Sequence, residues 1–167
     1  MKLILFRHGL AVDREIAILE KMEDSRRPLT SKGREKTEKM AKFLKGLELE
    51  IDLLVTSPLV RAVQTAEILF PIVKAKDIVE SAELVPSAPP QSFAQWLKSQ
   101  VKNSTCVMAV GHEPQLSVFA SWALSGSTDS FIELKKSGAI CLDFESLQDI
   151  TPRSAELLWV QQPKLIV

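Results

Sequence analysis

The chain of 167 residues contains two histidines, and each of them follows an apolar run and stands beside a glycine. His8 follows the run Lys2–Phe6, and His112 comes after the run Cys106–Val110 and one glycine. Apolar runs of this length predict buried strands. An imidazole at the end of such a strand can serve as a base, a nucleophile or a ligand. The repeated arrangement therefore predicts two imidazoles at one edge of a sheet.

Two arginines occupy matching positions. Arg7 directly precedes His8, and Arg61 falls in the first turn of a helix predicted after the strand Asp52–Thr56. Ligands of open α/β sheets bind outside the carboxyl ends of the strands, so parallel strands would bring both arginines and both histidines to one rim. Taken alone, a histidine after a strand is usually structural, and Arg61 would be a surface residue. Their coincidence predicts an anion pocket, most naturally for a phosphoryl group, because two guanidiniums can clamp its oxygens.

Within such a pocket, His8 could bind the phosphoryl group, act as a general base or attack phosphorus. Imidazole is a competent nucleophile near neutral pH because its unperturbed pKa is about 6.5. Its free nitrogen can attack if the other nitrogen is tethered, for instance to a backbone carbonyl. Flanking cations would keep the ring neutral, and Gly9 would allow the backbone to turn sharply beside the ligand.

The elements that must position these residues follow from hydrophobic spacing and from capping residues. Ser57 and Pro58 predict a helix start, with the serine as its cap and the proline in the first turn. Thr30 or Ser31 predicts the start of another helix, whose buried face would include Leu47. The full set comprises strands at Lys2–Phe6, Asp52–Thr56, Ile78–Glu80, Cys106–Val110, Gly138–Phe144 and Glu156–Val160, helices at about 30–47, 57–69, 91–102 and from Pro114 onward, and irregular stretches at 10–27 and 71–90.

Apolar strands that alternate with amphipathic helices predict an α/β fold. We expect a three-layer α/β/α sandwich around a mostly parallel sheet with mixed edge strands. The length suits one domain that spans residues 1–167. The pattern leaves open the order of the strands, the directions of the last two strands and the oligomeric state.

The composition is that of an ordinary globular protein, with 46% apolar and 25% charged residues. Since 21 Lys and Arg balance 21 Asp and Glu, the bulk charge indicates neither a nucleic-acid partner nor a membrane partner. Cys106 and Cys141 stand in apolar runs without ligand spacing, which predicts buried thiols rather than a disulfide or a metal site. With no apolar run near the roughly 20 residues of a membrane span, we expect a cytoplasmic protein.

The chemistry-bearing residues fall in motifs that resemble those of the histidine phosphatase superfamily, the phosphoglycerate-mutase-like proteins. The resemblance covers residues 2–116, in order and spacing. The small size of the chain and the helix entry at Arg27–Thr30 are most similar to those of the SixA-type phosphohistidine phosphatases. The motifs are Arg7-His8-Gly9, Pro28-Leu29-Thr30 with Gly33, the element Thr56–Ala66 that contains Arg61, and Gly111-His112.

The resemblance implies that His8 is transiently phosphorylated. It also implies that Arg7, Arg61 and His112 hold the phosphoryl group and stabilise its transition state, without a metal or another cofactor. The partner would be a phosphorylated substrate, for which we expect a phosphohistidine-bearing signalling or phosphotransfer protein.

The chain departs from the family pattern at the general acid. Many larger members carry a glutamate where this chain reads Leu84-Val85-Pro86, and the nearby Glu83 is equally well explained as a solvated loop carboxylate. Without a good acid, a phosphoramidate substrate is favoured, because its leaving nitrogen can be protonated before the P–N bond breaks. The alternatives are a small-molecule phosphomonoesterase or mutase of the same superfamily, and a non-catalytic module that docks a phosphorylated partner.

Overall fold

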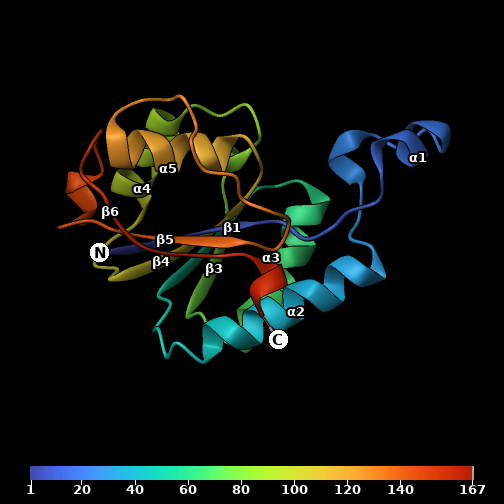
Figure 1. Cartoon of the computed structure of the whole chain (residues 1–167), viewed down its shortest axis with the longest axis horizontal. Coiled ribbons are helices and arrows are strands. Elements are labelled where there is room, and N and C mark those ends of the chain that lie inside the picture. The colour runs from blue at the N-terminus through green and yellow to red at the C-terminus, as the bar shows by residue number, and fades with distance from the viewer. Residues whose placement is uncertain (167) are drawn as a thin grey trace.

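One six-stranded sheet organises the computed structural model, which describes residues 1–166 (Figure 1). The strand order is β3-β2-β4-β1-β5-β6. The first four strands of the chain run parallel to one another, whereas β5 lies antiparallel to both β1 and β6. The predicted strands are confirmed within one or two residues at each end: β1 Lys2–Arg7, β2 Leu53–Thr56, β3 Asp77–Glu80, β4 Cys106–Gly111, β5 Ala139–Asp143 and β6 Glu156–Gln161.

Helices cover both faces of the sheet, which confirms the three-layer α/β/α sandwich. In Figure 1, α4 and α5 lie on one side of the strands, and α2 and α3 lie on the other. Within residues 1–166, every helix is too short or too polar to span a lipid bilayer. The helices are α1 Arg14–Leu19, α2 Ser31–Lys45, α3 Val60–Val73, α4 Pro90–Gln100 and α5 Gln115–Ser125.

Successive side chains of the strands point to opposite faces of the sheet and pack into two separate hydrophobic cores. Leu5 and Ala109 pack with Phe93 and Phe119 beneath α4 and α5. Phe6, their neighbour in the sheet, packs on the opposite face beneath α2 and α3. All six residues of β4 are buried because this strand lies inside the sheet with helices on both faces.

Helix α2 begins as predicted, since the Thr30 hydroxyl accepts a hydrogen bond from the Gly33 N–H at 3.0 Å. The prediction for its other end is wrong at Leu47. The helix ends at Lys45, so Leu47 lies beyond the last turn and is 39% exposed. Thr37, a polar residue, is fully buried on the inner face instead.

The prediction for α3 is wrong at both ends. The helix begins at Val60 rather than at Pro58, and its cap position is Leu59, so Ser57 is not the N-cap. At the other end the helix continues through Pro71 to Val73, in a stretch predicted to be irregular. Burial of Val73 against the α2–α3 core explains the extension, because the apolar spacing continues past the proline.

Both cysteines are free and buried, as predicted. Cys106 begins β4, and Cys141 lies in β5. Burial raises the pKa of the Cys106 thiol to about 11 and that of the Cys141 thiol to about 12. Such thiols remain protonated at neutral pH and behave as small apolar side chains.

The segment between β1 and α2 forms an arm that carries α1 away from the sheet (Figure 1). An antiparallel bridge between Ala11 and Leu29 closes the base of the arm. A 3-10 turn at Asp24–Arg26 returns the chain toward the sheet, where it contacts α3. The arm thereby places charged residues beside the end of β1.

Candidate functional site

A pocket of about 290 Å³ lies at the carboxyl ends of the parallel strands and contains all four predicted site residues. Strands β1, β4 and β2 are neighbours, and Arg7 pairs with Gly111 in the register of β1 and β4. The residues that follow these strands consequently emerge side by side, as the sequence predicted. The lining consists of Arg7, His8, Asp13, Arg14, Arg27, Arg61, Pro86, His112, Glu113 and Lys136.

The tautomer of His8 is set by its neighbour in the chain. Its Nδ1 lies 2.7 Å from the Gly9 carbonyl oxygen, which can only accept, so Nδ1 donates and Nε2 keeps its lone pair. Burial, followed by the charges of Arg61 and Arg7, lowers the pKa of His8 to about 3. The structure thus provides the tethered, neutral imidazole that the sequence predicted.

His112 lies against His8, with ring centroids 4.9 Å apart. Its Nε2 lies 2.8 Å from the hydroxyl of Ser57. The serine predicted as a helix cap therefore forms a hydrogen bond with a site histidine. Burial and the neighbouring His8 lower the pKa of His112. Its Nδ1 is buried and has no hydrogen-bond partner among residues 1–166.

Arg61 is 2% exposed, although it carries a full charge. Its guanidinium donates to the Asp24 carbonyl at 2.8 Å and to the Asp24 carboxylate at 3.2 Å. Arg14 and Arg27 also contact this carboxylate. Burial disfavours the Asp24 carboxylate, but the nearby arginines outweigh this effect and lower its pKa. The arm therefore supplies the anion that holds Arg61 in place.

Arg7 is anchored on the other side of the pocket. Its Nη1 donates to the Leu134 carbonyl at 2.7 Å. The N–H of Ser137 donates to the Arg7 and His8 carbonyls and fixes the loop before β5 against the end of β1. Both arginines are thus held by backbone carbonyls rather than left to move freely.

Donors without partners mark where a ligand would lie. In the described part of the chain, Arg7 Nε and Arg61 Nε are buried without a hydrogen-bond partner, as is His112 Nδ1. A buried unpaired polar group costs about 1–3 kcal/mol, so such groups require an explanation. All three nitrogens belong to side chains that line the pocket, as expected of a site that binds an anion.

Helix α3 ties the pieces of the site together. Its Thr65 hydroxyl accepts from the Gly9 N–H at 3.0 Å and donates to the Arg61 carbonyl one turn earlier. The adjacent Gln64 accepts from the Leu29 N–H at 2.8 Å. The spacing of Arg61, Gln64 and Thr65 therefore has a physical reason. Side chains of one helix contact the Asp24 carboxylate, the entry to α2 and the turn after His8, respectively.

Glu113 is a pocket residue that the sequence analysis missed. Its Oε2 accepts from the Ser117 hydroxyl, whereas its Oε1 is buried without a partner in residues 1–166. Burial raises the pKa of this carboxyl. Its position next to His112 in the sequence was the available signal. Pro86 lines the pocket near it, but Glu83 does not line it.

Lys136 and Asp24 were also missed, and neither carried a local signal. Lys136 lines the pocket from the loop before β5, whereas Asp24 lies outside the lining and contacts Arg61 from the 3-10 turn Asp24–Arg26. Both depend on loops that return to the site from a distance. Across residues 1–166, no group of three or more His, Cys, Asp or Glu side chains could hold a metal ion.

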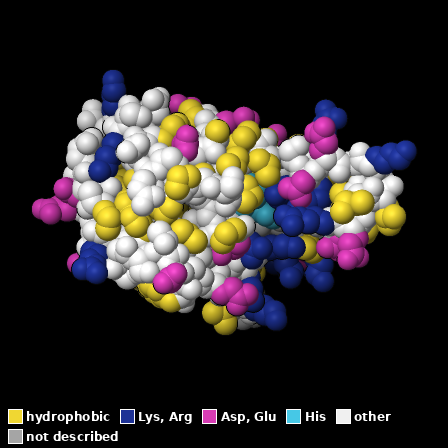
Figure 2. Space-filling view, turned by 90° about the horizontal axis from the view of Figure 1, so that it is seen from above, with side chains coloured by type: hydrophobic (Ala, Val, Ile, Leu, Met, Phe, Trp, Pro, Cys, Tyr) yellow, Lys and Arg dark blue, Asp and Glu magenta, His cyan; other side chains and the backbone are white. Residues whose placement is uncertain are grey.

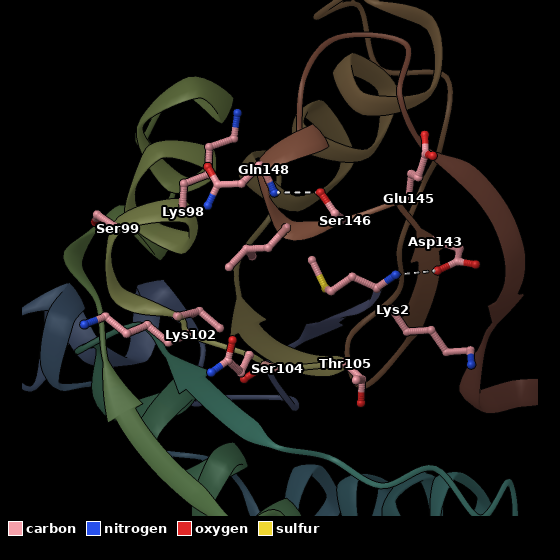
Figure 3. Close-up of a pocket in the computed structure, with 14 residues that line it drawn as sticks. Lys2, Lys98, Ser99, Lys102, Ser104, Thr105, Asp143, Glu145, Ser146 and Gln148 are labelled. Carbon is pink, nitrogen blue, oxygen red and sulfur yellow. Dashed lines mark hydrogen bonds and ion pairs between the residues drawn. The ribbon is translucent and has the colours of Figure 1, made fainter.

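A larger hollow, of about 840 Å³, lies at the opposite end of the parallel strands (Figure 3). It is lined by residues near the starts of β1 and β4, including Lys2 and Thr105, and by Lys98 of α4. None of the predicted site residues lies there. The smaller pocket is the candidate site because it holds the convergent charged groups.

Known proteins resemble this chain in sequence. The family model of the histidine phosphatase superfamily (branch 1) matches residues 3–84. An uncharacterized protein of Picosynechococcus is 34% identical over 168 residues, covering 100% of this chain and 99% of that protein. The phosphohistidine phosphatase SixA of Escherichia coli K12 is 28% identical over 150 residues, covering 86% of each chain.

A solved structure of the protein histidine phosphatase SixA in complex with tungstate has the same fold. Its TM-score is 0.83 at 23% sequence identity, with 98% of each chain covered. The fold also matches that of the α-ribazole phosphatase from Shigella flexneri, with a TM-score of 0.71 at 17% identity over 98% of this chain and 97% of that one. Phosphatases named for different substrates therefore share this architecture.

Proposed function

The chain belongs to the histidine phosphatase superfamily, and we propose that it is a phosphatase that removes phosphoryl groups from phosphohistidine in proteins through an intermediate on His8. Membership of the superfamily supports phosphatase activity. The observation that carries the proposed mechanism is the free Nε2 of His8, which faces a pocket with three buried, unpaired N–H or ring nitrogen atoms in the described residues.

In the first step, His8 Nε2 attacks the phosphorus of the substrate. A bond forms between Nε2 and phosphorus, and the bond between phosphorus and the substrate's imidazole nitrogen breaks. The leaving nitrogen takes a proton from the Glu113 carboxyl, whose raised pKa keeps it available as an acid. Charge develops on the phosphoryl oxygens, where Arg7, Arg61 and His112 stabilise it.

In the second step, water attacks the phosphorus of phosphorylated His8. The Glu113 carboxylate accepts the water proton, the bond between Nε2 and phosphorus breaks, and inorganic phosphate leaves. The Gly9 carbonyl holds Nδ1 throughout, so the ring returns to the same neutral tautomer. Glu113 therefore acts as the acid in the first step and as the base in the second, and the protein returns to its starting protonation state.

The substrate assignment rests on chemistry and on one relative. Pro86 lines the pocket where the family resemblance places an acidic residue in larger members, and Glu113 is a lining carboxyl whose pKa is raised by burial. A phosphoramidate needs less help from an acid than an alkyl phosphate does, since its leaving nitrogen is readily protonated. The similarity to the phosphohistidine phosphatase SixA of Escherichia coli supports the same assignment.

Replacing the nucleophile tests the mechanism. We expect His8→Ala to lower the turnover of a phosphohistidine peptide at least about 1,000-fold, because the substitution removes the nitrogen that forms the covalent intermediate. Brief exposure of the unmodified protein to labelled substrate should leave acid-labile label on His8. Lys102→Ala, a surface change at the far end of the sheet, serves as the control. Undiminished turnover by His8→Ala would overturn the covalent mechanism.

Competition tests the substrate class. A phosphohistidine peptide and an alkyl phosphomonoester presented together should be hydrolysed with kcat/KM values that differ about 100-fold or more in favour of the peptide. The reverse order would reassign the chain to small-molecule phosphatases. A chelator should leave both activities unchanged, because the arginines supply the positive charge; activity lost to a chelator and restored by zinc would contradict this.

A further inference from the structure

Resting on the proposed function, we propose that a groove beside the pocket docks an acidic segment of the phosphorylated protein substrate. The groove has a volume of about 710 Å³. We call it the lysine groove after Lys36, Lys135, Lys136 and Lys164, which line it. Its other lining residues are Arg7, Leu10, Glu133, Ser137, Gln162, Pro163 and Leu165.

The lysine groove is continuous with the pocket. Arg7 and Lys136 line both hollows, so a chain that leaves the pocket on this side enters the groove directly. The groove is assembled from four separate parts of the protein, namely the end of β1 with the turn after it, α2, the loop before β5 and the segment 162–165 after β6. A molecule whose phosphoryl group lies in the pocket can reach the groove only if it extends well beyond the phosphorylated residue.

Positive charge is concentrated around the two hollows, although the whole chain is neutral. Eight Lys or Arg residues line them against three Asp or Glu residues, whereas the chain holds 21 of each kind. In Figure 2, Lys and Arg side chains gather around the visible histidine, while the rest of that face shows scattered charges. The excess is therefore local to the site, which favours a negatively charged partner there.

The lysines of the groove differ in how free they are. Lys135 is paired with Glu133. Lys36 and Lys164 are exposed and form no ion pair within residues 1–166. Burial and the neighbouring Arg7 lower the pKa of Lys136, as expected where cations crowd together. The unpaired lysines would gain most from carboxylates that a partner brings.

Apolar side chains give the groove a second character. Leu10 and Pro163 line it, and Leu165 is 70% exposed at its edge. A surface that combines lysines with apolar groups fits a polypeptide that carries both acidic and aliphatic side chains. It is a poorer fit for free phosphate, which would leave the apolar groups exposed.

Two synthetic phosphohistidine peptides of equal length test the proposal. In one, the flanking residues include Asp and Glu; in the other, Asn and Gln replace them. We expect kcat/KM to favour the acidic peptide about 5- to 30-fold, and the preference should shrink at about 0.5 M NaCl because salt screens exposed charges. The double variant Lys36→Glu with Lys164→Glu should abolish the preference and should hydrolyse a small phosphoramidate within about twofold of the unmodified rate.

A matched control applies the same charge change elsewhere. Lys98→Glu with Lys102→Glu reverses two lysines at the hollow of Figure 3, at the far end of the sheet, and should leave the peptide preference intact. Equal kcat/KM for the two peptides with the unmodified protein would overturn the docking proposal. So would an equal loss of preference in the control pair.

Binding of the unphosphorylated peptides separates this proposal from the proposed function. Fluorescence anisotropy should show tighter binding of the acidic peptide, and the Lys36→Glu, Lys164→Glu variant should lose that difference. If neither phosphohistidine peptide is hydrolysed, the proposed function fails, yet the anisotropy still decides whether the groove binds acidic segments. Equal binding of both peptides would overturn the docking proposal on its own.

Discussion

At the scale of single residues, the site depends on hydrogen bonds that settle where protons lie. The Gly9 carbonyl fixes the proton of His8 on Nδ1, and Ser57 engages His112 at Nε2. Neither contact requires another charged group. Burial lowers the pKa values of both rings and so favours their neutral forms, and His8 then has Nε2 with a free lone pair.

Glu113 carries the prediction at this scale. Its carboxyl must be protonated to serve the leaving group, so kcat should fall as the pH rises through its pKa, which burial raises above the usual range. Glu113→Gln should remove this alkaline limb. It should lower kcat about 100-fold for an alkyl phosphate but only about 3- to 10-fold for a phosphoramidate, whose leaving nitrogen is protonated more easily.

The measurement is a pH profile of kcat for both substrates, with Glu83→Gln as the matched control. Glu83 lies in the neighbouring loop but outside the pocket lining, so its replacement should change neither profile. An alkaline limb that persists in Glu113→Gln would show that another group moves the proton.

At the scale of elements, sequence patterns predicted the parts that depend on local spacing. The strands, the cap at Thr30 and the meeting of Arg7, His8, Arg61 and His112 follow from apolar runs and from the geometry of parallel strands. These features require only that each strand end where its apolar run ends.

Other features depended on distant contacts and could not be read locally. Ser57 has a good capping side chain, yet its hydroxyl contacts both the Leu59 N–H and His112, which follows another strand, and α3 begins only at Val60. Asp24 reaches Arg61 only because the arm folds back across 37 positions of sequence. The helix or turn propensity of a residue does not show which distant residues its side chain will contact in the folded protein.

The packing of α2 against the arm makes an element-scale prediction. A Cβ on Gly33 would lie 2.1 Å from the Leu10 carbonyl oxygen, which belongs to the backbone just after the His8 turn. Gly33→Ala should therefore push this turn aside, lower the free energy of unfolding by about 2–3 kcal/mol and reduce kcat/KM. Urea unfolding and peptide hydrolysis measure the two effects.

Gly46→Ala at the end of the same helix is the control. Gly46 has an ordinary helical φ of −66°, and its new Cβ would meet only carbonyl oxygens of the preceding turn, the nearer at 3.2 Å. Its free energy of unfolding should stay within about 0.5 kcal/mol of the unmodified value. Equal effects of the two substitutions would mean that the contact with Leu10 does not matter.

At the scale of the whole molecule, charge is unevenly distributed although the net charge is zero. Lys and Arg side chains concentrate at one end of the sheet, around two buried histidines. Burial of the two histidines costs stability under acidic conditions, because it lowers their pKa values and so disfavours their protonation in the folded protein. Stability should therefore depend on pH in a way that reports the site itself.

The pH dependence has a definite sign. An unfolded histidine has a pKa of about 6.5, whereas burial lowers the pKa of folded His8 to about 3 and also lowers that of His112. Below about pH 6.5 the unfolded chain takes up protons that the folded protein cannot, so stability is greatest above that pH and falls on acidification. The slope is up to about 1.4 kcal/mol per pH unit for each histidine.

Urea unfolding between about pH 7 and pH 5.5 isolates this effect, since aspartates with lowered pKa values such as Asp24 contribute only below about pH 4. Over this range the unmodified protein should lose about 2.5 kcal/mol, and His112→Asn about half as much. Tungstate or vanadate at about 100 times its Kd should add about 2.7 kcal/mol at pH 7 by binding the folded state. An unchanged slope of stability against pH in His112→Asn would mean that burial does not hold the second histidine neutral.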